Sequence, residues 1–150
     1  MSWAELLAEN KVKAHTTSVA ELNKLRQVVA RDISDGQVTG LSADRRFACL
    51  YSAALQLAHM AVACAGYRVA TTTGHHKTSL ESMELCIGNP VRALVTYFDL
   101  CRRKRNMLEY DNASLTSEIE VQELLRKVKE LEMIVENWIA SNHPSLSPQS

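Results

Sequence analysis

Apolar residues recur every three or four positions through most of this chain, and that spacing predicts α-helices. The clearest apolar stripe follows residues 117–120 and continues to about Ile139. Residues 117–120 form a capping box, in which Ser and Glu satisfy each other's backbone N–H groups. A second capping box, at 18–21, opens another stripe that continues to about Ile33. We expect one helix in each of these segments.

The segment 47–65 is apolar on nearly every side of a helix and holds no charged residue. Ser42 provides an N-cap before it, and Gly66 provides a stop after it. Its length approaches that of a membrane span, but Gln56 and His59 would then lie in the middle of the bilayer. We therefore expect the central helix of a bundle, whose alanines let neighbouring helices approach closely, and no membrane span.

Two further helices are predicted between this helix and the last one. A polar loop is expected over 66–76, and a third capping box, at 78–81, opens a short helix that ends near Ile87. Pro90 suits the first turn of a longer helix that ends near Asn112.

Together these segments predict an all-α protein, an up-and-down bundle of about five helices. Residues 18–140 form the bundle in this interpretation. Residues 1–17 are a short helical extension, and residues 141–150, which contain prolines and serines, are a flexible tail.

The composition adds limits on partners and location. The 150 residues suit one domain with a real core, and 17 basic residues balance 17 acidic ones, so the chain has no global attraction for nucleic acid or membrane. Any basic site must be local. The four cysteines form no C-x-x-C pair, and the first residues lack the features of a signal peptide. We therefore expect reduced, buried thiols in a cytoplasmic protein.

One local basic site is the run of four cations at 102–105. On a helix with about 100° per residue, Arg105 falls on the same inward stripe as Phe98 and Cys101. A buried guanidinium must find acceptors, because an unpaired buried charge is strongly destabilising. The partner could be Glu109, in a structural salt bridge, or a bound phosphate, which suits the fork geometry of arginine. The pattern leaves both interpretations open.

The histidines suggest little chemistry by themselves. His75 and His76 are adjacent, but no third metal ligand lies at a suitable spacing, so we expect ordinary polar loop residues. His59, in the apolar segment, is expected to be a hydrogen-bonded core histidine. The sequence has no catalytic serine or cysteine signature, phosphate-binding glycine loop or metal motif, so we expect no metal site and no cofactor.

The order of four stretches resembles the HEPN family (higher eukaryotes and prokaryotes nucleotide-binding domains) over about 19–138. The stretches are the charged start of the alanine-rich helix at 44–55, Gly66-Tyr67-Arg68 after it, the segment 74–80, and the late stretch 105–110. The late stretch is similar to that of bacterial single-domain members with an Arg…Tyr ending. The resemblance implies a compact helical bundle that forms a dimer.

The resemblance also implies a site in the late stretch. In HEPN ribonucleases, an Arg, a polar residue and a later His from both subunits form one composite site for metal-independent RNA cleavage. Arg105 matches the Arg and Asn106 the polar residue, but Tyr110 stands where the His would fall. A tyrosine, with a pKa of about 10, is a poor base at neutral pH. Cleavage is then lost, or Tyr110 serves only as a hydrogen-bond donor.

Three functions follow from these observations. The first is a dimer that binds RNA or a nucleotide at a cleft, without efficient cleavage, and the cleft is lined by Arg102, Arg105, Asn106 and Tyr110. The second is a non-catalytic interaction module, a homodimer or a partner of a nucleotidyltransferase-type protein, in which Arg105 forms an interface salt bridge. The third is a ribonuclease toxin of a toxin–antitoxin system, in which His75 or His76 takes the role of the family's catalytic histidine.

Overall fold

The computed structural model describes residues 1–111 and 116–148, with the backbone alone at 108–111. Within these ranges the chain is mostly helical, which confirms the expected all-α class. The helices are α1 (Trp3–Ala8), α2 (Val19–Asp35), α3 (Ala43–Cys64), α4 (His75–Ile87), α5 (Asn89–Asp111) and α6 (Glu118–Asn142). The other described elements are two short strands and a 3-10 turn: β1 (Val12–Ala14), β2 (Tyr67–Val69) and η1 (Pro144–Leu146).

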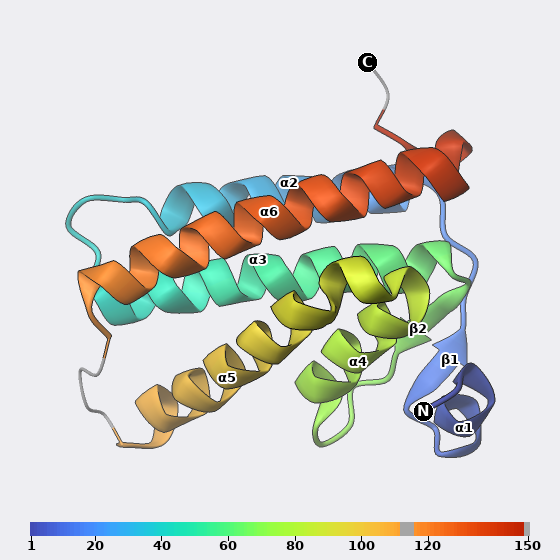
Figure 1. Ribbon diagram of the computed structural model, residues 1–150, viewed down its shortest axis with the longest axis horizontal. Coiled ribbons are helices and arrows are strands. Elements are labelled where there is room, and N and C mark those ends of the chain that lie inside the picture. Colours follow the sequence, from blue (N-terminus) through green and yellow to red (C-terminus); the bar gives the residue numbers. More distant parts are fainter. Residues whose placement is uncertain (112–115, 149–150) are drawn as a thin grey trace.

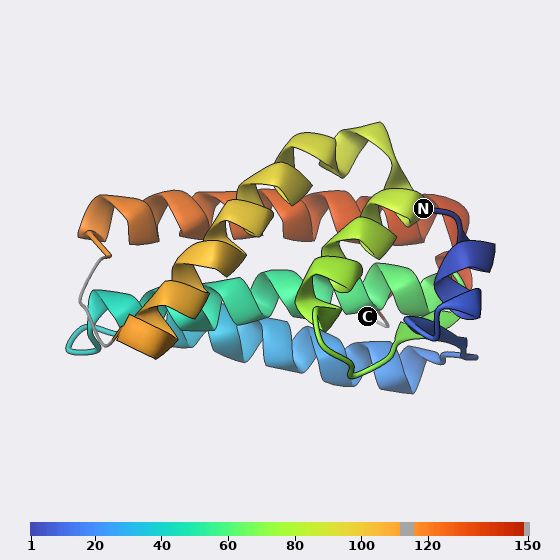
Figure 2. The same ribbon diagram turned by 90° about the horizontal axis from the view of Figure 1, so that it is seen from below.

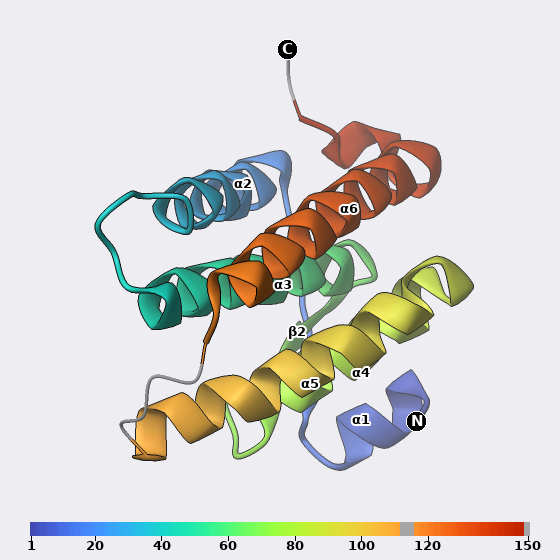
Figure 3. The same cartoon turned by 60° about the vertical axis from the view of Figure 1, so that its left-hand side comes forward.

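α3 lies at the centre of the bundle (Figure 1). Helices α2 and α6 cover one side of it, and α4 and α5 cross the other side (Figures 1 and 3). α1 and the antiparallel pair β1–β2 lie together at one end of the molecule, near the end of α3 (Figure 2). Because α3 contacts four other helices, any group that it carries on its α4–α5 side lies between three helices.

α3 is the core helix that the sequence predicts. The Ser42 hydroxyl accepts a hydrogen bond from Arg45 N (3.2 Å), and Gly66, with a φ of 97°, lets the chain turn away after the helix. α3 is long and apolar enough to cross a membrane, yet 72% of its apolar window is buried inside the protein. This burial is that of a core helix in a soluble bundle.

Gly36, just after α2, allows α2 and α3 to approach closely. A Cβ atom at this position would lie 2.5 Å from both Cγ and Cδ2 of Leu50, whose side chain is fully buried in α3. The φ of Gly36 is −65°, so any residue could adopt this backbone conformation. Space, and not backbone freedom, therefore requires glycine here.

We expect Gly36→Ala to lower the free energy of unfolding by about 1–2 kcal/mol, because the added methyl group overpacks the core against Leu50. Without that clash, alanine would stabilise the protein by about 0.4–1 kcal/mol through the unfolded state. Urea unfolding followed by circular dichroism measures the change. Ser34→Ala, at an exposed position of the same helical turn, is the control and should change stability by less than about 0.5 kcal/mol. A Gly36→Ala protein as stable as the wild type would contradict the prediction.

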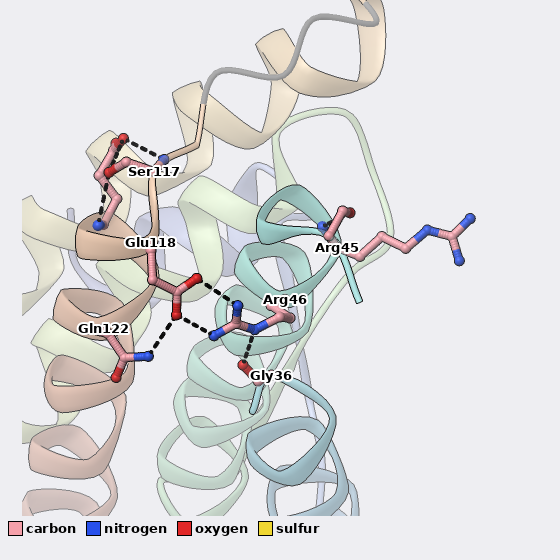
Figure 4. Close-up of polar contacts among 8 residues, drawn as sticks. Gly36, Arg45, Arg46, Ser117, Glu118 and Gln122 are labelled. Atoms are coloured by element: carbon pink, nitrogen blue, oxygen red, sulfur yellow. Dashed lines mark hydrogen bonds and ion pairs between the residues drawn. The ribbon is translucent and has the colours of Figure 1, made fainter. Parts of the chain in front are cut away.

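An ion pair joins the ends of α2, α3 and α6 (Figure 4). Arg46 donates to both carboxylate oxygens of Glu118 at 2.7 Å and, through Nε, to the Gly36 carbonyl at 3.1 Å. The hydrogen bonds from Arg46 hold the pKa of Glu118 at about 2. The neighbouring Arg45 is exposed and points away from this network (Figure 4). The start of α6 is thus tied to the start of α3.

The capping box at the start of α6 is confirmed, while the one at the start of α2 is half formed. The Ser117 hydroxyl accepts from Glu120 N, and the Glu120 carboxylate accepts from Ser117 N. Ser18 likewise accepts from Glu21 N, but the Glu21 carboxylate lies 2.7 Å from His15 Nε2 and accepts from the Thr17 hydroxyl. Ser18 therefore works as a one-sided cap.

The predicted capping box at 78–81 is wrong. α4 begins earlier, at His75, after Gly74 in the left-handed conformation (φ 80°). Thr78 and Ser79 are buried inside the helix, and their hydroxyls donate to the Gly74 and His75 carbonyls. Because hydroxyls can bond to the preceding turn of a helix, the same residues fit a cap or a helix interior.

Two further segments differ from the expectation. Tyr67–Val69 pairs with Val12–Ala14 as β2 and β1, where a loop and a helix end were expected. Strands of three residues are too short to show a period of two in the sequence. Residues 141–146 were expected in a flexible tail, but α6 continues to Asn142 and Arg26 Nη2 donates to the Leu146 carbonyl in η1 (2.9 Å).

Candidate functional site

Arg102, Arg103 and Lys104, in the run of cations at 102–105, each pair with a carboxylate of the chain. Arg102 Nε and Arg103 Nη2 lie 2.9 Å and 3.3 Å from the two carboxylate oxygens of Asp99, one turn earlier on α5. Lys104 donates to Glu120 on α6. The run is therefore not an open basic patch, because carboxylates of the same chain offset much of its charge.

Arg105 takes a different direction and lies against α3. Its guanidinium carbon is 5.8 Å from the centroid of the Tyr51 ring, which is a cation–π contact. Arg105 is partly buried and follows the buried Phe98 and Cys101 on the inward side of α5. The predicted structural partner, Glu109, lies where the structure describes no side chains. The aromatic face restrains the orientation of the guanidinium plane.

Tyr51, whose ring contacts this guanidinium, carries a buried hydroxyl group. The side chain is fully buried, and Oη has no hydrogen-bond partner within the described residues. Burial raises the pKa of the phenol, while the charges of Arg102 and Arg105 act in the opposite direction. An unsatisfied buried hydroxyl costs about 1–3 kcal/mol, so its presence here requires an explanation.

His76 approaches Tyr51 from α4. The two ring centroids are 5.9 Å apart, and His76 also contacts His75 edge to face, with centroids 4.4 Å apart. His75 Nδ1 lies 2.9 Å from the Thr72 carbonyl. The two histidines begin α4, so the expectation that they lie in a loop is wrong. Tyr51 brings Arg105 of α5 and His76 of α4 into one cluster.

His59 is the hydrogen-bonded core histidine that the sequence predicts. Ser79 Oγ donates its single proton to the His75 carbonyl (2.8 Å), so His59 Nε2–H must donate to Ser79 Oγ (2.9 Å). Burial lowers the pKa of His59 to about 4, and the neighbouring His76 and His75 act in the same direction. His59 is therefore neutral at pH 7, in the tautomer with a proton on Nε2.

The four residues that the sequence analysis assigns to a binding site have different positions. Arg102 and Arg105 both act electrostatically on Tyr51. Asn106 follows them on α5 and is partly buried. Tyr110 lies in the last turn of α5, outside the residues whose side chains the structure describes.

Tyr51 is not among the predicted site residues, because an aromatic residue in an apolar helix is usually part of the core. A signal was nevertheless present. Tyr51 and His59 are eight residues apart, which places them about 80° apart around the helix axis, on the side of α3 that faces α4. His76 was placed wrongly because the predicted helix began after it.

The four cysteines are unsuited to nucleophilic catalysis. All four cysteines are free, and Cys64 and Cys101 are buried. Burial raises the pKa of Cys86 to about 12 and the pKa values of Cys64 and Cys101 to about 11. Thiols with such pKa values are protonated at neutral pH and are poor nucleophiles.

In the α3–α4–α5 cluster, defined as Tyr51, His59, His76 and Arg105, the guanidinium of Arg105 is the cationic donor group suited to an anion such as phosphate, while the N–H of His59 is already used by Ser79. Among the residues that the structure describes, no group of three or more His, Cys, Asp or Glu side chains could hold a metal ion. Comparison of the chain with known protein families, with curated proteins and with solved structures finds no match. The function is therefore inferred from the cluster itself.

Proposed function

We propose that this protein is a HEPN-like cytoplasmic dimer that binds RNA or a nucleotide, without efficient cleavage. The observation that carries the proposal is the position of Arg105, whose guanidinium lies against the ring of Tyr51 on the inward side of α5. Arg102, Asn106 and Tyr110 complete the binding surface, as the family resemblance implies.

The chemistry of the cluster favours phosphate as the recognised group. The planar guanidinium of Arg105 can donate to two phosphate oxygens at once. Its contact with Tyr51 orients that plane before a ligand arrives, which lowers the entropy lost on binding. The Tyr51 hydroxyl, which is fully buried and lacks a partner among the described residues, would complete its hydrogen bonding through a water that bridges it to a bound phosphate.

Efficient cleavage is not part of the proposal, because the described bases are weak. His59 has a pKa of about 4, far below the value near 7 that suits a general base at neutral pH. Tyr110, at the position of the family's histidine, is also a poor base. His76 contacts Tyr51, so a ribonuclease toxin, the third function considered, would depend on His76.

A second candidate function, a non-catalytic interaction module, is supported by apolar surface on α5. Leu100 and Met107 are 58% and 50% exposed and lie two helical turns apart on the same side of the helix. Exposed apolar side chains on one face favour contact with another protein surface. In this function, α5 contacts a second copy of the chain or a nucleotidyltransferase-type partner, and Arg105 forms an interface salt bridge.

Fluorescence anisotropy distinguishes these functions. The wild-type protein is titrated into a fluorescein-labelled single-stranded RNA of mixed sequence at several salt concentrations. We expect saturable binding with a Kd that rises with salt, because phosphate contacts release counterions. Light scattering after size exclusion gives the oligomeric state. A dimer with no affinity for RNA or nucleotide at low salt would favour the interaction module, and RNA cleavage during the titration would favour the toxin.

A further inference from the structure

A second cationic site lies on the β1–β2 ribbon, beside α1 (Figure 1). In the antiparallel register Lys13 is directly opposite Arg68, so the two side chains lie on the same face of the ribbon. Both are exposed, whereas Val12 belongs to the other face and is buried. Like charges directly opposite each other destabilise a strand pair. A negative charge near Lys13 and Arg68 would therefore stabilise the ribbon.

The described part of the chain does not supply that counter-charge. Within it, neither Lys13 nor Arg68 has a side-chain hydrogen bond or an ion pair. Glu21 lines a small pocket together with Arg68, but Glu21 Oε1 is engaged by His15 Nε2 at 2.7 Å and by the Thr17 hydroxyl at 2.8 Å. The repulsion on the ribbon is thus uncompensated by these residues.

Both cations line one pocket of about 360 Å³. The other residues that line it are Asn10, Val69, Ala70, Thr71 and Thr72. None of these described lining residues is acidic, and the two threonines add hydroxyl donors. The volume is within the range of small-ligand sites, which begins at about 300 Å³. Cations and neutral donors around a concave surface are the features of an anion site.

We propose that this pocket is a phosphate-binding site, in which Lys13 and Arg68 hold the anion from two neighbouring strands. Lys13 provides a compact charge, Arg68 provides a planar fork, and Thr71 and Thr72 provide hydroxyl donors. Binding removes the repulsion between the two cations, so the ligand stabilises the ribbon. No member of the α3–α4–α5 cluster lines the pocket, so the site is separate from the one proposed above.

The pocket also lies next to the start of α4 in the sequence. The Thr72 carbonyl, at the edge of the pocket, is 2.9 Å from His75 Nδ1, and His75 contacts His76 of the cluster. The ligand could therefore be a small phosphate compound or the 5′-phosphate of an RNA bound at Arg105. Both sources present the same chemical group to the pocket.

The site is tested with inorganic pyrophosphate, at constant ionic strength set with chloride, by NMR titration of the isotope-labelled full-length protein. We expect saturable shifts of the backbone amides of residues 10–13 and 68–72 and a higher Tm with pyrophosphate. The double variant Lys13→Gln/Arg68→Gln should bind pyrophosphate at least about tenfold more weakly and lose the increase in Tm. Lys129→Gln, an exposed lysine of α6, is the control and should behave as the wild type.

Several outcomes overturn the proposal. They are wild-type affinity in the double variant, shifts that increase linearly with pyrophosphate, and shifts confined to the α3–α4–α5 cluster. If Lys13 and Arg68 had only a structural role, the double variant would have a lower Tm than the wild type without pyrophosphate. We expect its Tm at low ionic strength to equal or exceed that of the wild type, because the two cations repel each other. Lys13→Gln alone provides a milder variant if the double variant does not fold.

Two further comparisons separate this site from the RNA proposal and identify the source of the phosphate. Arg105→Ala keeps the pocket and should bind pyrophosphate as the wild type does; loss of that binding would contradict a separate site. Tighter binding of 5′-phosphorylated than of 5′-hydroxyl RNA, lost in the double variant, would support an RNA end as the ligand. Equal binding of the two RNAs, with pyrophosphate still bound, would support a small phosphate compound.

Discussion

We expect Arg105→Ala to weaken the binding of single-stranded RNA at least about tenfold while the fold is retained. A hydrogen bond to a charged group contributes about 1.5–3 kcal/mol, and about 1.4 kcal/mol corresponds to a tenfold change in affinity. The contact with Tyr51 orients the guanidinium in advance, so the substitution also removes preorganisation. In anisotropy titrations, the slope of log Kd against log salt should fall by about 0.7, the value for one phosphate of a single strand.

Arg103→Ala is the matched control for this prediction. Arg103 has the same charge on the same helix, but its side chain is 66% exposed and lies 3.3 Å from Asp99. Its removal should change the affinity less than about twofold. Arg105→Lys, which keeps the charge but not the fork, should give an intermediate affinity. Equal losses for the two alanine variants would mean that charge alone explains binding, and a monomeric Arg105→Ala protein with unchanged RNA affinity would favour an interface role.

The second large effect is a loss of folding stability at acidic pH. The protein should lose on the order of 3 kcal/mol of stability between about pH 6.5 and pH 4, because of His59. The pKa of His59 is lowered from 6.5 to about 4 in the folded state. Between these values the unfolded chain binds a proton that the folded chain does not, so falling pH favours unfolding. The contribution is fully present above about pH 6.5.

Urea unfolding at a series of pH values from 7.5 to 4 measures this dependence. His59→Gln does not titrate and keeps an N–H that can donate to Ser79, so its stability should vary less over this range. His143→Gln, just after α6, is the control and should keep the wild-type dependence. Glu118, with a pKa of about 2, loses its contribution only below about pH 4.5, so the two effects are separable. Constant wild-type stability from pH 6.5 to 4.5 would contradict the assignment.

Helices were predictable from the sequence where a cap and a long apolar stripe coincide. α3 follows Ser42 and α6 follows Ser117, and in both cases the hydroxyl accepts the backbone N–H that the pattern predicts. The inward direction of Arg105 could also be expected, because it depends only on the period of one helix. Local signals of this kind do not depend on the rest of the fold.

The missed features depend on contacts between distant segments. The Ser79 hydroxyl is paired inside α4 because His59 of α3 donates to it, and no pattern near Ser79 contains that information. The same holds for Lys13 and Arg68, which become neighbours only when β1 and β2 pair. Tyr51 becomes distinctive only when α4 and α5 place His76 and Arg105 beside it. Tertiary packing, and not local propensity, creates these sites.

The central position of α3 has a consequence for synthesis on the ribosome. α2 and α3 are complete before α6, which packs against α3 beside α2, has been translated. The emerging chain therefore exposes part of an apolar helix with the length and hydropathy of a membrane span until α6 arrives. Transiently exposed surface of this kind is what chaperones bind and what drives aggregation. The arrival of α6 thus completes the burial of α3 as the core helix of the bundle.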